Sequence, residues 1–165
     1  MGRQSRYVYY QPNRKDLQDK YGDCTIRALS RVLDASWLET FDRMIPFCRE
    51  AQVANIFGAP IQVRAHLLER LGFKYTGVSI KKGSTRPTVD SFAKTHKTGR
   101  YILNVAHHEV AVVDGKYYDT WDSGHKSVYG WFELVQPGQR TEEGLPRKDT
   151  EQQGSMPSDA EGNAP

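Results

Sequence analysis

Hydrophobic residues in the first half of the chain recur with the period of an α-helix. From Thr25 onward they fall three or four positions apart, at Ile26, Leu29, Val32 and Leu33. Asp23 is a favoured N-cap residue, because its short side chain can accept a hydrogen bond from the first turn. The pattern therefore predicts a helix that starts at Cys24 or Thr25 and ends near Asp34.

Three later segments have the same period. The segment 36–39, SWLE, is a capping box and predicts a second helix that runs toward Pro46. Pro60 suits a first helical turn, and Gly72 marks the end of this third helix. Residues 88–97 predict a fourth helix, with Val89, Phe92 and Ala93 facing inward. The apolar face of the third helix consists of Val63, Leu67, Leu68 and Leu71.

The second half of the chain has the alternating or continuous apolar runs of β-strands. Asp114-Gly115 is a strong signal for a two-residue hairpin between two such runs. Helices first and antiparallel strands later predict an α+β domain, with N-terminal helices packed on an antiparallel β-sheet. The expected strands lie within residues 3–10, 73–80, 101–113, 116–121 and 127–134.

The composition changes after residue 136. Residues 137–165 hold three basic and six acidic residues and almost no large apolar side chain, which predicts a disordered acidic tail. The formal charge of +3 therefore divides into about −3 on this tail and about +6 on residues 1–136. We expect one folded domain, 1–136, and the tail accounts for part of the low mean hydropathy of −0.69.

Cysteine and histidine usage indicates neither a disulfide framework nor a metal site. Cys24 and Cys48 are the two cysteines of the chain, and the five histidines lack ligand spacing, so we expect no metal and no other cofactor. The chain has no apolar run long enough to cross a membrane and no signal-peptide pattern. These features predict a soluble protein of the reducing cytoplasm, without a membrane partner.

Cys24 is the first candidate for chemistry. At the start of a helix it lies among free backbone N–H groups, at the positive end of the helix dipole. That environment favours the thiolate, which is the reactive form of a cysteine. The ordinary alternative is a buried structural cysteine, and the position in a polar loop-to-helix junction argues against it.

The Asp114-Gly115 hairpin brings a base and a carboxylate together. In its register Val112 faces Tyr117, so His108 and Asp119 project from one side of the sheet as diagonal neighbours. The carboxylate is then close enough to orient the imidazole, and Trp121 lies beside both. His107 is the competing base; it faces the opposite side in a regular strand, and a bulge would exchange the two histidines.

These residues form a catalytic set in the order nucleophile, base, orienting acid. Cys24 would attack, His108 would take its proton, and Asp119 would set the tautomer of His108. Gln18, just upstream of the cysteine, can donate its side-chain amide to an oxyanion, together with the backbone N–H of Cys24. The ordinary alternative for Gln18 is an exposed surface glutamine.

Two motifs carry a resemblance to a known family. The pattern Gln18…Asp23-Cys24 opening a helix and the hairpin HEVAVVDGKYYDTWDSG together resemble the papain-like cysteine peptidase superfamily, nearest to the small C39-like peptidases of bacteria and phages. The resemblance covers residues 17–132. It implies a papain-like fold with Cys24 as nucleophile, His108 as base, Asp119 as its orienting acid and Gln18 in the oxyanion hole. Asp122 stays open as the third member, since papain-like enzymes usually have a longer stretch after the histidine.

The resemblance implies a thiol hydrolase that cleaves a peptide or isopeptide bond in a protein or peptide substrate, in the host cytoplasm if the protein is phage-encoded. The same triad also carries out amidase, deamidase and transglutaminase-like chemistry, and the sequence does not choose among these reactions. The alternative is a catalytically inactive papain-like fold that serves as a protein-binding module. Basic residues interleaved with tyrosines near the N-terminus favour a third class, nucleic-acid binding. No nucleic-acid motif accompanies them, so a solvated basic face explains them better.

Overall fold

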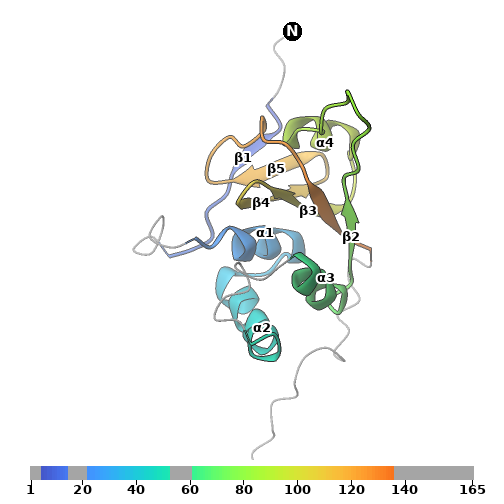
Figure 1. Ribbon diagram of the computed structural model, residues 1–165. Helices are drawn as coiled ribbons and strands as arrows, with labels where there is room; N and C mark the ends of the chain where they lie inside the picture. Colours follow the sequence, from blue (N-terminus) through green and yellow to red (C-terminus); the bar gives the residue numbers. More distant parts are fainter. Residues whose placement is uncertain (1–4, 15–21, 53–60, 136–165) are drawn as a thin grey trace, which may run out of the picture.

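The fold was determined as a computed structural model, which describes residues 5–14, 22–52 and 61–135. N-terminal helices pack against a six-stranded, mostly antiparallel open sheet, as the α+β prediction requires (Figure 1). Gln18, Pro60 and the predicted acidic tail lie outside the described residues, as does the side chain of Val63.

The sheet has the strand order β1-β5-β4-β3-β6-β2. Its neighbouring strands are antiparallel except for the edge pair β1 and β5, which is parallel. The strand bounds are β1 Tyr7–Tyr9, β2 Phe73–Gly77, β3 Arg100–Val105, β4 His108–Val113, β5 Lys116–Asp119 and β6 Gly130–Leu134.

Helices cover both faces of this sheet. Helix α1 (Cys24–Leu33) packs against β4, β3 and β5, while α4 (Val89–Thr95) packs against β5 and β4 on the other face (Figure 1). Helix α2 (Trp37–Glu50) packs on α1, and α3 (Ile61–Glu69) packs on β2.

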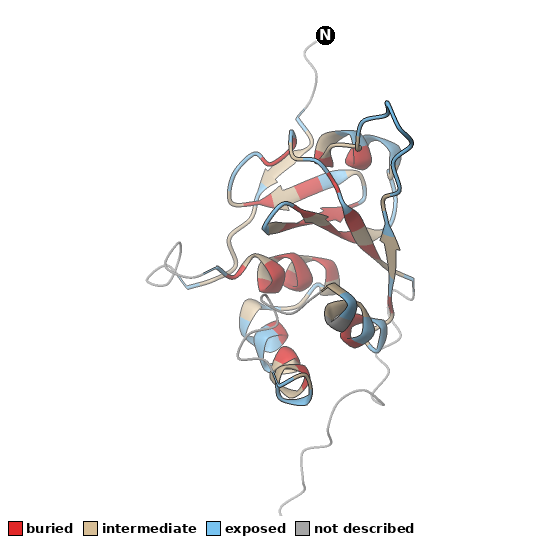
Figure 2. Ribbon diagram, viewed as in Figure 1, coloured by how far each residue is buried: buried red, intermediate tan, exposed pale blue. Residues whose placement is uncertain are grey.

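Two apolar clusters lie on the two faces of the sheet. Leu29 of α1 packs with Ala111 and Phe132 in the first cluster, and Phe92 of α4 packs with Val110 in the second. Ala111 and Val110 are consecutive residues of β4 and point to opposite faces, as the period of a strand requires. Figure 2 shows the buried positions concentrated on α1 and the central strands. The central strands are therefore buried on both sides.

The local signals in the sequence place some helix ends correctly, whereas α3 ends at Glu69 before the predicted Gly72 and α4 ends at Thr95 before the predicted Lys97. Helix α1 ends at Leu33 and α4 begins after Thr88, both as predicted. Helix α2 continues through Pro46 to Glu50 and is longer than predicted. Proline in a helix interior removes one backbone hydrogen bond, and the burial of Phe47 against the core offsets that loss.

The predicted strand 101–113 is wrong in one respect, because the chain folds back in its middle. Residues 106 and 107 form a tight turn between β3 and β4, with Val105 opposite His108. His107 takes the left-handed conformation there, with φ 54°, which histidine adopts more readily than most residues. The consequence for the site is that His108 becomes the first residue of a strand.

The capping box of α2 provides a test of the local signals. The Ser36 hydroxyl accepts from the Glu39 N–H, and the Glu39 carboxylate accepts from the Ser36 N–H. Replacing Ser36 by alanine is expected to lower the free energy of unfolding by about 1 kcal/mol. Urea unfolding measures this, with Ser84→Ala in an exposed turn as the control. An equal effect of both changes would contradict a specific role of the cap.

Candidate functional site

Cys24 is the first residue of α1, and its side chain is partly buried. Asp23 occupies the N-cap position, as predicted. Cys24 therefore lies where backbone N–H groups of the first turn lack helical acceptors. The thiol lies at the N-terminal, positive end of the α1 dipole, and α1 itself packs on the sheet.

The side chain of Asp23 does not act as a cap within the described structure. It is buried, and its Oδ2 accepts hydrogen bonds from Asn13 Nδ2 and Trp37 Nε1, each at 3.0 Å. Its Oδ1 forms an ion pair with Arg27. Asp23 thus ties together the segment before the helix, the helix α1 and the start of α2, directly beside Cys24.

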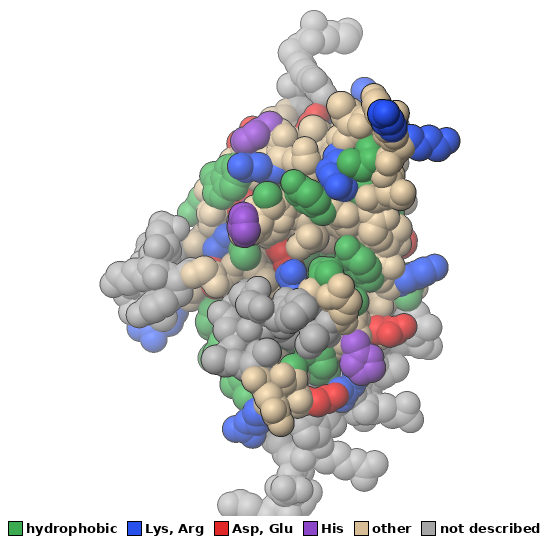
Figure 3. Space-filling model, viewed as in Figure 1, with side chains coloured by type: hydrophobic (Ala, Val, Ile, Leu, Met, Phe, Trp, Pro, Cys, Tyr) green, Lys and Arg blue, Asp and Glu red, His purple; other side chains and the backbone are tan. Residues whose placement is uncertain are grey.

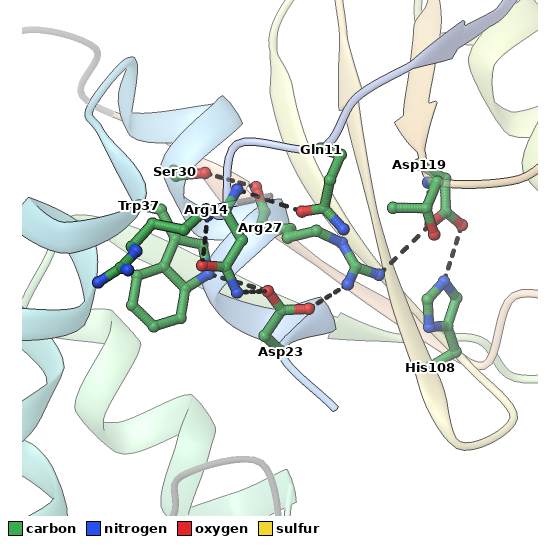
Figure 4. A network of polar contacts seen from close by, with 10 residues as sticks. Gln11, Arg14, Asp23, Arg27, Ser30, Trp37, His108 and Asp119 are labelled. Atoms are coloured by element: carbon green, nitrogen blue, oxygen red, sulfur yellow. Dashed lines mark hydrogen bonds and ion pairs between the residues drawn. The ribbon is translucent and has the colours of Figure 1, made fainter. Parts of the chain in front are cut away.

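His108 and Asp119 make the contact that the hairpin register predicts. The Nε2 of His108 donates to Oδ2 of Asp119 at 2.7 Å (Figure 4). The register Val112 to Tyr117 is the predicted one. Since β4 begins at His108 and β5 ends at Asp119, both side chains lie at the same end of the sheet.

The carboxylate of Asp119 is almost fully buried, with 2% of its side chain exposed. Its other oxygen, Oδ1, accepts from the backbone N–H of Thr120 at 2.8 Å and lies 3.7 Å from Arg27 Nη2. A carboxylate held by this many donors has a fixed orientation. It therefore orients the imidazole of His108 and favours the imidazolium form.

Cys24 also acts on the pKa of the imidazole. Burial of the ring lowers the pKa of His108, but hydrogen bonds to Asp119 and Cys24, together with their charges, outweigh burial and raise this pKa to about 9. His108 is therefore an imidazolium at neutral pH. The structure brings Cys24, His108 and Asp119 together from three elements.

The two alternatives from the sequence lie elsewhere. His107 is exposed in the turn between β3 and β4. Asp122 accepts from the hydroxyl of Tyr117 at 2.6 Å and from the N–H of Gly124 at 3.0 Å. Burial raises the pKa of Tyr117, and the hydrogen bond to Asp122 raises it further. Asp122 therefore fixes the loop after β5, and Asp119 is the carboxylate that contacts His108.

Trp121 stands beside the imidazole, as predicted from the hairpin. Its ring centroid lies 5.5 Å from that of His108, and the Lys126 ammonium lies 5.5 Å from the Trp121 ring centroid. With 39% of Trp121 exposed, the indole covers the imidazole from one side and also presents an aromatic surface to solvent.

Two arginines near the site were not predicted from the sequence. Arg27 lies between Asp23 and Asp119, and its four-residue spacing from Asp23 was an available signal. Arg64 of α3 pairs with Glu109, the residue after His108, and no pattern in the sequence indicated this pair. Burial lowers the pKa of Arg64, whereas the charge of Cys24 acts in the opposite direction. Arg64 is thus within electrostatic range of the thiol.

A cavity of about 490 Å³ lies beyond the loop after β5. Arg6 and Asp90, which form an ion pair at 3.1 Å, line it together with the hydrogen-bonded residues Tyr117 and Asp122. His125 also lines it and contacts Trp121, with ring centroids 6.1 Å apart. Cys24, His108 and Asp119 do not line this cavity, so it is separate from their cluster.

The described residues contain neither a metal-binding cluster nor a membrane-spanning helix. Within residues 5–14, 22–52 and 61–135, no group of three His, Cys, Asp or Glu side chains is arranged to hold a metal ion. Among the helices of these ranges, none is long and apolar enough to cross a membrane. Comparison of the chain with protein-family models, curated proteins and solved structures found no match. The site is therefore interpreted from its own geometry.

Proposed function

We propose that this protein is a cysteine-dependent hydrolase of the papain-like superfamily, nearest to its small C39-like branch, that cleaves a peptide or isopeptide bond. The observation that carries the proposal is the 2.7 Å hydrogen bond from His108 Nε2 to the buried carboxylate of Asp119, made by an imidazole whose pKa Cys24 also raises. A nucleophile, a base and an orienting acid in mutual contact are the recurring arrangement of acyl-transfer enzymes.

The arrangement supports a two-step reaction. Because Nε2 of His108 is engaged by Asp119, Nδ1 is the nitrogen left for the thiol. The sulfur of Cys24 adds to the carbonyl carbon, the imidazolium of His108 protonates the departing amine, and a thioester forms. Water then gives its proton to His108 and attacks the thioester, which releases the carboxylic acid and restores the thiol.

The oxyanion of each step would be stabilised by backbone N–H groups at the start of α1, including that of Cys24. Gln18 remains our prediction for a side-chain donor to the same oxyanion. The expected partner is a protein or peptide substrate. Since both Cys24 and Cys48 are unbridged and the reaction requires a free thiol, we place the protein in the reducing cytoplasm.

The geometry supports the other function classes less well. A protein-binding module with an inactive papain-like fold does not need an imidazole held between a thiol and a buried carboxylate. For nucleic-acid binding, the relevant feature is a gathered basic surface. In the face drawn in Figure 3, lysine and arginine side chains are spread among hydrophobic, acidic and histidine side chains.

The test is the pH dependence of Cys24 alkylation by iodoacetamide, in a Cys48→Ala background so that one thiol reports. We expect Cys24 to react at pH 6 at least about tenfold faster than in the His108→Ala variant, because the imidazolium favours the thiolate where an ordinary thiol, of pKa about 8.5, is almost fully protonated. Equal rates in both proteins would overturn the catalytic proposal and favour the binding module.

A further inference from the structure

Arg27 connects the two halves of the site. Its Nη1 forms the ion pair with Oδ1 of Asp23, and its Nη2 lies 3.7 Å from Oδ1 of Asp119. The guanidinium is largely buried, with 12% of the side chain exposed. Figure 4 shows the fork of Arg27 between the two carboxylates, with His108 at the other oxygen of Asp119.

In each of the two carboxylates, one oxygen faces Arg27 and the other accepts hydrogen bonds from other side chains. Oδ1 of Asp23 serves Arg27, while its Oδ2 accepts from Asn13 and Trp37. In Asp119, Oδ1 faces Arg27 and Oδ2 accepts from His108. A continuous chain of polar contacts therefore runs from the residue before Cys24, through Arg27, to the imidazole.

We propose that Arg27 is a positioning residue of the hydrolase, whose fork fixes the nucleophile end of α1 relative to the His108–Asp119 pair. This inference rests on the function proposed above. Arg27 itself does not need to touch the substrate. It acts through Asp23 on one side and through Asp119 on the other.

Apolar packing alone does not supply this positioning. Helix α1 packs on the sheet through residues such as Leu29, and burial of apolar area is non-directional. A planar guanidinium presents donors in a rigid fork, so two carboxylates bound to it have a defined separation. The positive charge also offsets the repulsion between two buried carboxylates. Lysine offers one ammonium on a flexible stem and cannot hold both in the same way.

Arg31 provides a matched control on the same helix. It lies one turn after Arg27, and its Nη2 donates to the hydroxyl of Tyr118 at 3.1 Å. Its guanidinium also stacks on that ring, 4.2 Å from the centroid. Arg31 therefore joins α1 to the residue beside Asp119 without contacting the carboxylate itself.

The experiment measures the alkylation rate of Cys24 at pH 6 in the Cys48→Ala background, with and without His108→Ala. Arg27→Met is expected to slow labelling about tenfold, toward the rate of His108→Ala, because small displacements of reacting groups cost this much or more. The labelling rate of Arg27→Lys should lie between those of Arg27→Met and the parent. The rate of Arg31→Met should stay within about twofold of the parent's. In the His108→Ala background, Arg27→Met should change the rate by less than about twofold, because its effect passes through the imidazole.

Other outcomes overturn the inference. A slow Arg27→Met rate that persists in the His108→Ala background, or an equal loss in Arg31→Met, would assign Arg27 to stability alone. Thermal unfolding of each variant separates loss of fold from loss of reactivity, and Arg27→Lys keeps the test decisive if Arg27→Met does not fold. If Cys24 of the parent is alkylated faster than Cys24 of His108→Ala, and Arg27→Met has the same rate as the parent, this inference fails and the proposed function stands. If the parent is no faster than His108→Ala, both fail.

Discussion

Replacement of Glu109 by leucine is expected to lower the free energy of unfolding by about 3–5 kcal/mol. The reason is that Arg64, with 13% of its side chain exposed, loses the carboxylate that compensates its buried charge. Burial already lowers the pKa of Arg64 with Glu109 present. Urea unfolding at neutral pH measures the loss.

The double variant Arg64→Met, Glu109→Leu is the control for this expectation. Removing both charges leaves no unpaired ion, and an apolar pair of similar volume restores most of the stability. The pair also leaves Nε of Arg64 and Oε2 of Glu109 buried without a hydrogen bond among the described atoms, so its replacement removes an unfavourable feature as well. A Glu109→Leu protein as stable as the parent would show that the ion pair does not compensate Arg64.

Stability is expected to fall by about 3 kcal/mol as the pH rises from 6.5 to above 9. The pKa of His108 is raised from 6.5 in the unfolded chain to about 9 in the folded one. The folded state therefore binds a proton that the unfolded state has lost in this range. The stabilisation is fully present below pH 6.5 and disappears as the pH passes through about 9. Urea unfolding at a series of pH values gives the profile.

Two variants assign that decline to the His108–Asp119 pair. In Asp119→Asn the imidazole keeps a polar neighbour but loses the negative charge, so most of the decline should vanish. In His108→Ala the contribution should be absent, and any remaining slope belongs to other groups. A decline of the same size in all three proteins would contradict the assignment to His108.

Local signals in the sequence were sufficient where neighbouring residues decide the structure. The capping box at Ser36 and Glu39 and the buried face of Val89, Phe92 and Ala93 are both confirmed. Such features depend on residues three or four positions apart, whose spacing is visible in the sequence. The Asp114-Gly115 turn predicts contacts between residues farther apart in the chain, because one turn sets the register of the strands on both sides.

The hairpin register predicted one part of the candidate site, and the helix signals predicted another. The contact between His108 and Asp119 follows from the hairpin, and Cys24 at the start of α1 follows from the helix signals. Their catalytic roles remain predictions. The turn at residues 106–107 was not predictable in the same way, because the segment 101–113 contains no strong turn pair.

The choice between the open alternatives required the tertiary structure. Asp119 and Asp122 are three residues apart, and both follow the same strand pattern closely enough to remain candidates. What separates them is that Asp122 is bound by Tyr117, whereas Asp119 is buried between His108 and Arg27. Burial and the identity of the partner depend on elements distant in the chain.

The sequence by itself determined most of the elements of this protein, the hairpin register and a short set of candidate residues for its proposed chemistry, because each depends on short-range spacing. Only the tertiary structure decided that β1 pairs parallel with β5, that Arg27 joins Asp23 to Asp119, and that Arg64 pairs with Glu109 beside the site. The physical reason is that these contacts join segments with no shared periodicity. The ion pairs form where packing buries charged side chains, because a buried charge is costly unless an opposite charge lies beside it.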